Sequence, residues 1–320
     1  MRKIVETHTG KIITDTDMTL EYLYVGDYGK KNNIKASFLG YDNRIDEVKN
    51  QPVDINQKLV VTVSSQKGCP CDCGFCDCPK LGFKGNASFA EMMSEIMTGI
   101  ALSKIKHGKR LNVHFARMGE PTFNMDVINA ANAIYQCNLN FDEYHPVVST
   151  MMPKANKNLI NFLRTWVDSG YWYGGDDGYG LQFSINTLNE KDRNEMFRDK
   201  SLSLSEIGSI IKRLPAPMNR KFTLNFAVTS KANLDPEIMD KYFCKERCIV
   251  KITPIHETVE AVAEGFEIIK DFDVYEKFEQ PLVKDGWDVI VFVPSKEEDE
   301  DRITCGNSLI ALESEEASDK

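Results

Sequence analysis

Five cysteines within ten positions constrain this chain more than any other feature of its sequence. The chain of 320 residues has nine cysteines, and the crowded ones are Cys69, Cys71, Cys73, Cys76 and Cys78. Nine are too few for a disulfide scaffold, so such crowding in a cytosolic chain favours metal binding. The first residues, MRKIVETHTG, contain no apolar segment after the basic ones. We therefore expect a cytoplasmic protein without a secretory signal.

The overall composition excludes several classes of protein. A hydrophobic content of 42 % and a mean hydropathy of −0.35 fit a folded, water-exposed chain and exclude a disordered or fibrous one. No stretch approaches the roughly 18 consecutive apolar residues of a membrane helix. The formal net charge is −9, but residues 296–320 contain nine acidic and three basic residues. The rest of the chain is thus near neutral and remains compatible with nucleic-acid binding.

The central part of the sequence alternates short apolar runs with helical patterns. This alternation predicts an α/β fold with parallel strands and crossover helices. With six or seven such units we expect a partial (β/α)6 barrel, whose functional residues collect at the carboxyl ends of the strands. The expected strands are 59–63, 111–115, 145–149, 181–185, 222–228, 248–253 and 289–293. The expected helices are about 88–100, 124–135, 156–168, 204–214, 235–243 and 273–284.

The flanking segments predict a division of the chain into four parts. We expect a small separate β-rich cap at 1–57, in which 20–42 forms two strands around a turn. The partial barrel then takes 58–295, followed by a loop at 296–312 and an acidic tail at 313–320. Residues 171–180, YWYGGDDGYG, indicate an exposed hairpin tip inserted in the barrel.

The spacing of three cysteines indicates a specific kind of metal centre. Cys69, Cys73 and Cys76 form C-x3-C-x2-C directly after an expected strand. Three thiolates can hold a four-iron cluster and leave one iron open, where the amino and carboxylate groups of S-adenosylmethionine (SAM) can bind. The alternative is a structural zinc site. Its fourth ligand would be Cys71 or Cys78, or come from the distant pair Cys244 and Cys248.

Segments along most of the chain resemble one enzyme family. The sequence SSQKGCPCDCGFC at 64–76 is similar to the cluster loop of the radical SAM adenosine methyltransferases. This family modifies carbon 2 of an adenosine in ribosomal and transfer RNA, and its antibiotic-resistance members modify carbon 8. Further segments resemble family motifs in the same order, at 117–124, 147–153, 181–193 and 291–309.

The resemblance implies the cofactors and their ligands. A 4Fe-4S cluster would bind to the three spaced cysteines, and SAM would contact Gly119, Glu120, Ser149, Ser184, Ile185, Asn186 and Asn233. Glu120 would accept hydrogen bonds from the SAM ammonium group, and its alternative role is that of a helix cap. The family further implies an rRNA or tRNA substrate, a flavodoxin-type electron donor and a monomeric enzyme.

The resemblance also implies a mechanism that uses Cys305. One SAM molecule methylates this thiol, and a second is reductively cleaved to a 5′-deoxyadenosyl radical. The radical removes a hydrogen atom from the new S-methyl group, and the resulting carbon radical adds to adenine. Holding these groups in contact is a proximity effect.

Three departures from the family pattern put the standard reaction in doubt. Thr62 stands where the family has the cysteine that resolves the RNA adduct, and a hydroxyl cannot form a disulfide. Cys71 or Cys78 is the expected substitute. Glu47 is the expected general base, and the chain has no room for the helical RNA-binding domain of many members. Two other functions remain open, a radical SAM enzyme with a peptide or small-molecule substrate and a non-catalytic zinc module.

Overall fold

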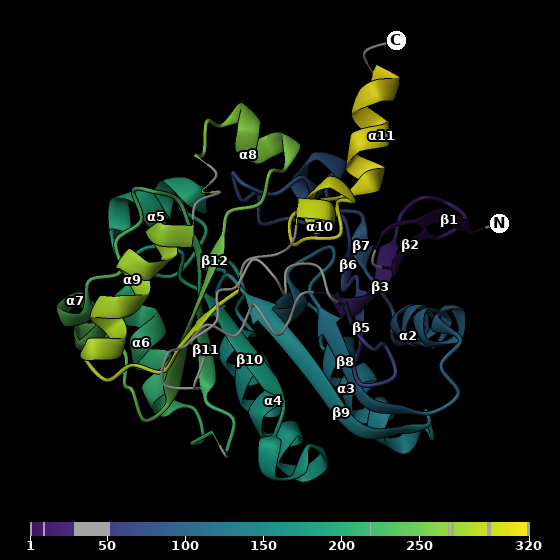
Figure 1. Ribbon diagram of the computed structural model, residues 1–320, viewed down its shortest axis with the longest axis horizontal. Coiled ribbons are helices and arrows are strands. Elements are labelled where there is room, and N and C mark those ends of the chain that lie inside the picture. The colour runs from purple at the N-terminus through teal and green to yellow at the C-terminus, as the bar shows by residue number, and fades with distance from the viewer. Residues whose placement is uncertain are drawn as a thin grey trace.

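A large, mostly parallel sheet forms the centre of the molecule (Figure 1). The computed structural model describes residues 2–8, 10–28, 52–217, 219–267, 269, 272–292 and 296–318. Seven strands run parallel in sequence order: β5 (Leu59–Val63), β8 (Gly108–Phe115), β9 (Phe141–Thr150), β10 (Gly180–Ser184), β11 (Phe222–Val228), β12 (Cys248–Pro254) and β13 (Val289–Val291). The α/β class is confirmed. Within the described residues β13 and β5 do not pair, so the sheet is not closed into a barrel.

Helices follow the strands and cover the outside of the sheet. Those expected from the sequence are α2 (Phe89–Ser103), α3 (Asp126–Gln136), α4 (Leu159–Tyr173), α6 (Leu204–Arg213), α7 (Pro236–Tyr242) and α9 (Phe272–Lys284). Ser88 and Glu91 form the capping box that starts α2. Four short helices were not expected: α5 (Glu190–Met196), α8 (Val259–Ala263), α10 (Lys296–Glu300) and α11 (Leu309–Ser318).

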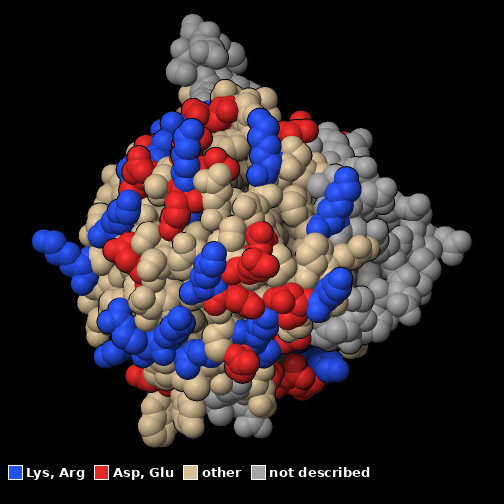
Figure 2. All heavy atoms as spheres, turned by 90° about the vertical axis from the view of Figure 1, so that its left-hand side faces the viewer, with Lys and Arg blue, Asp and Glu red and all other residues tan. Residues whose placement is uncertain are grey.

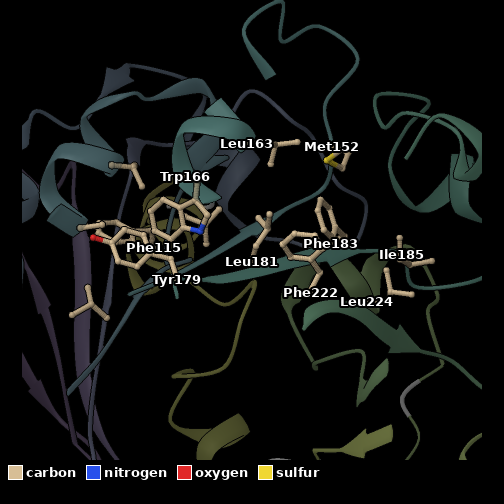
Figure 3. Close-up of a cluster of buried hydrophobic side chains, with 14 of the residues drawn as sticks. Phe115, Met152, Leu163, Trp166, Tyr179, Leu181, Phe183, Ile185, Phe222 and Leu224 are labelled. Atoms are coloured by element: carbon tan, nitrogen blue, oxygen red, sulfur yellow. The ribbon is translucent and has the colours of Figure 1, made fainter. Parts of the chain in front are cut away.

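The apolar core lies between the sheet and these helices. Figure 3 shows Trp166 of α4 beside Phe115 and Tyr179, with Leu181 and Phe183 further along the same layer. The strands alternate, so their other face carries partly exposed and polar side chains. These include Asn112, His114, Ser149, Gln182, Ser184, Asn225 and Lys251. This polar face can receive a ligand that the core face cannot.

The N-terminal strands extend the sheet and are not a separate cap. β1 (Lys3–Glu6), β2 (Gly10–Thr14) and β3 (Glu21–Tyr28) are antiparallel, and β3 pairs with β5. A short β4 (Pro52–Val53) also pairs with β3. Sequence alternation predicted strands here but could not name their partner. The second strand expected in 20–42 lies outside the described residues.

Two expected loops are partly helical. Tyr171 and Trp172 are exposed, at 59 % and 83 %, but they end α4 and do not form a hairpin tip. α10 interrupts the expected loop at 296–312, and α11 runs from Leu309 into the expected acidic tail. None of the helices in the described ranges combines the length and apolar character that a membrane crossing requires.

Candidate active site at the carboxyl edge of the sheet

The cysteine loop, residues 68–78, follows β5 at the carboxyl edge of the parallel strands. Its base is a two-stranded ribbon of β6 (Gln66–Lys67) and β7 (Gly85–Asn86). Gly68 has φ +75°, and a Cβ there would lie 1.6 Å from the carbonyl oxygen of Gly82. A larger residue would therefore force this crossing apart. The loop is also held from the far side, because the Gly74 amide donates to the Met196 carbonyl at 3.0 Å.

The five crowded cysteines fall into two groups by exposure. The three spaced thiols, Cys69, Cys73 and Cys76, are partly exposed. Cys71 is buried in an apolar cluster that includes Phe197, and Cys78 in another that includes Met118, Ile310 and Leu81. The expected cluster ligands thus remain accessible, whereas the two additional cysteines serve in packing.

The two kinds of metal centre that the sequence predicts, a 4Fe-4S cluster and a structural zinc, require different donor arrangements. Among the described residues, no three His, Cys, Asp or Glu side chains converge closely enough to hold one metal ion. A structural zinc needs four donors around one point, whereas a 4Fe-4S cluster spreads its thiolates over different irons. Cys248 begins β12 and therefore lies at the opposite edge of the sheet from the cysteine loop. The distant pair with Cys244 is thus excluded as a source of ligands to the cysteine loop.

Glu120 lies at the same edge, after β8, and its carboxylate is engaged by the protein. Its Oε1 accepts from the Thr122 amide and hydroxyl at 3.2 and 2.6 Å, and its Oε2 accepts from the Met151 amide at 2.9 Å. Desolvation by burial raises the pKa of this carboxyl. The expected helix-cap alternative is thus present, because Glu120 caps a short 3-10 helix at Pro121–Phe123. A contact with a SAM ammonium group remains a prediction.

Gln66 joins the Gly119–Glu120 turn to the cysteine loop. The Gln66 Oε1 accepts from the Glu120 amide at 2.8 Å, and its Nε2 donates to Asn86 at 2.8 Å. The side chain packs against Gly119, where a Cβ would lie 2.4 Å from the Gln66 Cβ. Ser149, near the end of β9, is in register with Gln182 of β10.

The ends of β10 and β11 place the remaining expected SAM contacts. Ser184 is in register with Asn225, and the Ile185 and Asn186 amides both donate to the Asn225 carbonyl, at 2.8 and 3.2 Å. Ile185 is fully buried in the core. Asn186 has φ +65°, and its Nδ2 is buried without a hydrogen-bond partner. An unpaired buried amide beside a strand end is a candidate ligand contact.

Asn233 lies in the segment between β11 and α7. Its Oδ1 accepts from the Asp235 amide at 2.9 Å, so its carboxamide forms a local turn before α7. Its amide donates to the Thr187 hydroxyl at 3.1 Å, which connects it to the segment after β10. Asn233 also lines a groove of about 920 Å³ between the start of α7 and α9. Its role in SAM binding remains a prediction.

The loop that carries Cys305 lies directly on the cysteine loop. The Asp77 amide donates to the Gly306 carbonyl at 2.9 Å, although the two residues are far apart in sequence. Gly306 has φ +90°, and a Cβ there would lie 3.3 Å from the Phe75 carbonyl oxygen. Cys305 itself is exposed to solvent. Desolvation by the surrounding protein and the nearby Cys76 thiol raise the pKa of the Cys305 thiol, against the opposing effect of Lys251 and Arg117.

Thr62 and its expected substitutes, Cys71 and Cys78, lie in β5 and in the cysteine loop. Thr62 is on β5, in register with His114 of β8. A hydrogen bond to Cys76 and burial raise the pKa of the Cys78 thiol well above its ordinary value. A hydrogen bond to Cys69 and burial likewise raise the pKa of Cys71. Glu47 lies outside the described residues.

Three polar residues near Cys305 were not singled out from the sequence. Arg117 and Glu21 form a buried ion pair under the Cys305 loop, with side chains 2 % and 0 % exposed. Lys251 projects from the polar face of β12, in register with Asn225. Arg117 opens the segment RMGEPTFN, so its position after an apolar strand was a usable signal. Glu21 is far from every motif and gave none.

Charged side chains on the α7 and α9 side of the molecule are mixed in sign (Figure 2). Lys245 pairs with Asp240 and Asp285 at 2.9 and 2.6 Å, and Lys221 pairs with Asp288 at 2.7 Å. Exposed pairs of this kind contribute little to stability and neutralise one another. Lys221 and the basic residues near it are therefore not part of a positively charged patch on this side of the molecule.

Comparison with known proteins supports the assignment of the fold and identifies sequence relatives. No family model matches the chain. It is 36 % identical to the dual-specificity RNA methyltransferase RlmN of Campylobacter hominis over 229 residues, which are 71 % of this chain and 60 % of that protein. It is 24 % identical to a probable RlmN of Leptospira interrogans over 72 % of this chain and 59 % of that protein. The chain thus spans about three fifths of the length of these relatives.

The fold agrees with that of a solved structure. A radical SAM methyltransferase from Sphaerobacter thermophilus superimposes with a TM-score of 0.67, covering 97 % of this chain and 81 % of that one at 16 % identity. The parallel sheet of this chain thus has the fold of a radical SAM methyltransferase. The sequence relatives show that the chain belongs to the RlmN/Cfr-like family.

Proposed function

We propose that this chain is a radical SAM methyltransferase that methylates an adenosine of RNA through Cys305. The contact between the cysteine loop and the Cys305 loop carries the proposal. The Asp77 to Gly306 hydrogen bond of 2.9 Å holds Cys305, an exposed residue, beside the residues that would bind the cofactor. This proximity is what transfer from a cofactor to a thiol and onward to a base requires.

Cys69, Cys73 and Cys76 would hold a 4Fe-4S cluster. Their partial exposure and their spacing within one loop fit such a group. When bound, the cluster supplies the electron for reductive cleavage of SAM. Gly119, Glu120, Ser149, Ser184, Ile185, Asn186 and Asn233 would contact SAM. Of these, Asn186 offers the clearest free donor, its buried Nδ2.

Cys305 would accept a methyl group from SAM before it meets the RNA. Its sulfur forms a bond to the methyl carbon, the bond from that carbon to the SAM sulfonium breaks, and the thiol proton leaves to solvent. Solvent access to Cys305 provides a route for that proton and for the substrate base. Cys71 or Cys78 would resolve the adduct only after local opening, because both are buried. Glu47 would act as the general base.

The substrate and partners belong to the same proposal. The RlmN relatives are named as RNA methyltransferases, so we propose rRNA or tRNA as substrate. We also propose a flavodoxin-type electron donor, a monomeric state and a cytoplasmic location.

RNA mass spectrometry tests this function. The full chain and Cys305→Ala are expressed in a host that lacks its own enzyme of this family. We expect new methyladenosine in RNA with the full chain and none with C305A. If SAM is cleaved but RNA stays unmodified and Cys305 unmethylated, the RNA assignment is wrong and a peptide or small-molecule substrate is favoured.

A further inference from the structure

A buried ion pair lies beneath the Cys305 loop and joins two strands. Arg117 follows β8, and Glu21 is the first residue of β3. The Arg117 Nε donates to Glu21 Oε1 at 2.7 Å, and its Nη2 also contacts that carboxylate. Replacing such a pair by apolar residues often costs little, so burial alone does not explain its presence.

The same pair holds both ends of the segment that carries Cys305. Arg117 donates to the carbonyls of Arg302 and Thr304, at 3.0 and 3.4 Å. Thr304 directly precedes Cys305. On the other side, Glu21 Oε2 accepts from the amides of Leu309 and Ile310, at 2.8 and 3.1 Å. Cys305 thus lies between two anchored points that meet at one ion pair.

The backbones of the pair also contact the cysteine loop and the residue that follows β5. The Ser64 hydroxyl, between β5 and the cysteine loop, donates to the Glu21 carbonyl. Cys78 Sγ donates to the Arg117 carbonyl at 3.6 Å. One ion pair therefore contacts the Cys305 loop through its side chains and the cysteine loop through its backbone. The planar guanidinium of Arg117 can donate hydrogen bonds to a carboxylate and two carbonyls at once. A lysine ammonium is a compact group with three donors and cannot reach all of these acceptors from the same position.

We propose that Glu21 and Arg117 are positioning residues that set the place of Cys305 relative to the cysteine loop. The inference rests on the proposed function of Cys305, because it gives the pair a role in methyl transfer to that thiol. A second contact, from Thr304 to Asp299 at 3.0 Å, holds the outer side of the loop. Loss of the pair would therefore loosen the loop without detaching it.

The first test needs neither iron nor SAM. Hydrogen exchange is measured on the apo full chain for wild type, Arg117→Lys and Glu21→Gln. Arg247→Lys is the matched control, since Arg247 also donates to two carbonyls, Leu214 at 2.6 Å and Pro215 at 3.0 Å, near the opposite edge of the sheet. We expect exchange at Leu309 and Ile310 to rise about tenfold or more in R117K and E21Q, but not in R247K. Unchanged exchange in both variants overturns the proposal.

The second test separates positioning from general loss of structure. Cluster-loaded R117K and wild type are compared for SAM cleavage to 5′-deoxyadenosine and for single-turnover methylation of Cys305. We expect cleavage within roughly twofold of wild type and methylation lower by about tenfold or more. An equal loss of SAM cleavage and Cys305 methylation contradicts a positioning role, and so does an unchanged rate of both reactions. Wild type that neither cleaves SAM nor methylates Cys305 refutes the proposed function, whereas the exchange test still decides whether the pair anchors the loop.

Discussion

A buried carboxyl beside Ser64, the residue after β5, predicts a pH-dependent stability. Glu95 of α2 is 3 % exposed, and its Oε2 accepts from the Ser64 amide at 2.8 Å. Its Oε1 is buried without a hydrogen-bond partner. Desolvation raises the pKa of Glu95 well above its ordinary value of 4.5. Above pH 4.5, and up to this raised pKa, the folded chain holds a proton on Glu95 that the unfolded chain has released.

The size of the effect follows from proton linkage. Between pH 4.5 and the raised pKa of the folded state, the folded protein binds one more proton than the unfolded one. The free energy of unfolding then falls by about 1.4 kcal/mol for each pH unit as the pH rises. Glu95→Gln removes this proton uptake. Relative to wild type, E95Q should gain about 1.4 kcal/mol for each pH unit above 4.5, until the pH reaches the raised pKa of the folded state.

Urea unfolding of the apo full chain at several pH values measures this gain. Glu91→Gln is the control, because Glu91 lies on the same helix and its pKa is lowered by Lys67 and Ser88 against the effect of burial. E91Q should differ from wild type by a constant amount above pH 5. A stability difference for E95Q that is also independent of pH would refute the reasoning, because it would mean that Glu95 is ionised in the folded protein.

Three further predictions concern the loops and one buried histidine. Gly68→Ala should destabilise the apo chain by roughly 2 kcal/mol or more in thermal unfolding and lower the iron bound after reconstitution, because its Cβ would overlap the Gly82 carbonyl. Gly265→Ala is the control, with a similar φ of +73° but open space around it, and equal effects would contradict the overlap. Cys305→Ala should cleave SAM at a rate within roughly twofold of wild type but should not transfer a methyl group to RNA. RNA methylation by C305A would exclude the thiol intermediate. Burial and the Arg110 charge lower the pKa of His145 to about 4. The free energy of unfolding should therefore fall as the pH drops from 6.5 to 4, and His145→Gln should remove roughly 3 kcal/mol of that loss. Identical acid unfolding of wild type and H145Q would show that His145 is charged when folded.

Local patterns were enough to predict the parallel sheet and its main helices. Strand β8 and helix α2 follow from period-two and period-3.6 apolar patterns, which depend on neighbouring residues alone. The capping box at Ser88 marks where α2 begins for the same reason. Because parallel strands end at one edge, the motifs after β5 and β8 could be placed together before their contacts were known.

Long-range pairing could not be predicted from the sequence. The alternation in β3 is compatible with a separate cap, and its pairing with β5 depends on a strand far along the chain. The acidic residues after Leu309 are typical of a solvated tail, yet Glu21 binds the amides at the start of α11. The Glu21 to Arg117 pair joins residues 96 positions apart. No periodicity links such residues, because their contact exists only in the folded sheet.

Reductive cleavage of SAM by the anaerobically reconstituted chain tests the central claim most directly. With a chemical reductant, we expect about four irons per chain, an altered cluster spectrum when SAM is added, and steady formation of 5′-deoxyadenosine. The triple variant Cys69→Ala, Cys73→Ala and Cys76→Ala should lose all three properties. Colourless protein that binds zinc, or a cluster whose spectrum ignores SAM and yields no 5′-deoxyadenosine, would contradict an iron site left open by three cysteines.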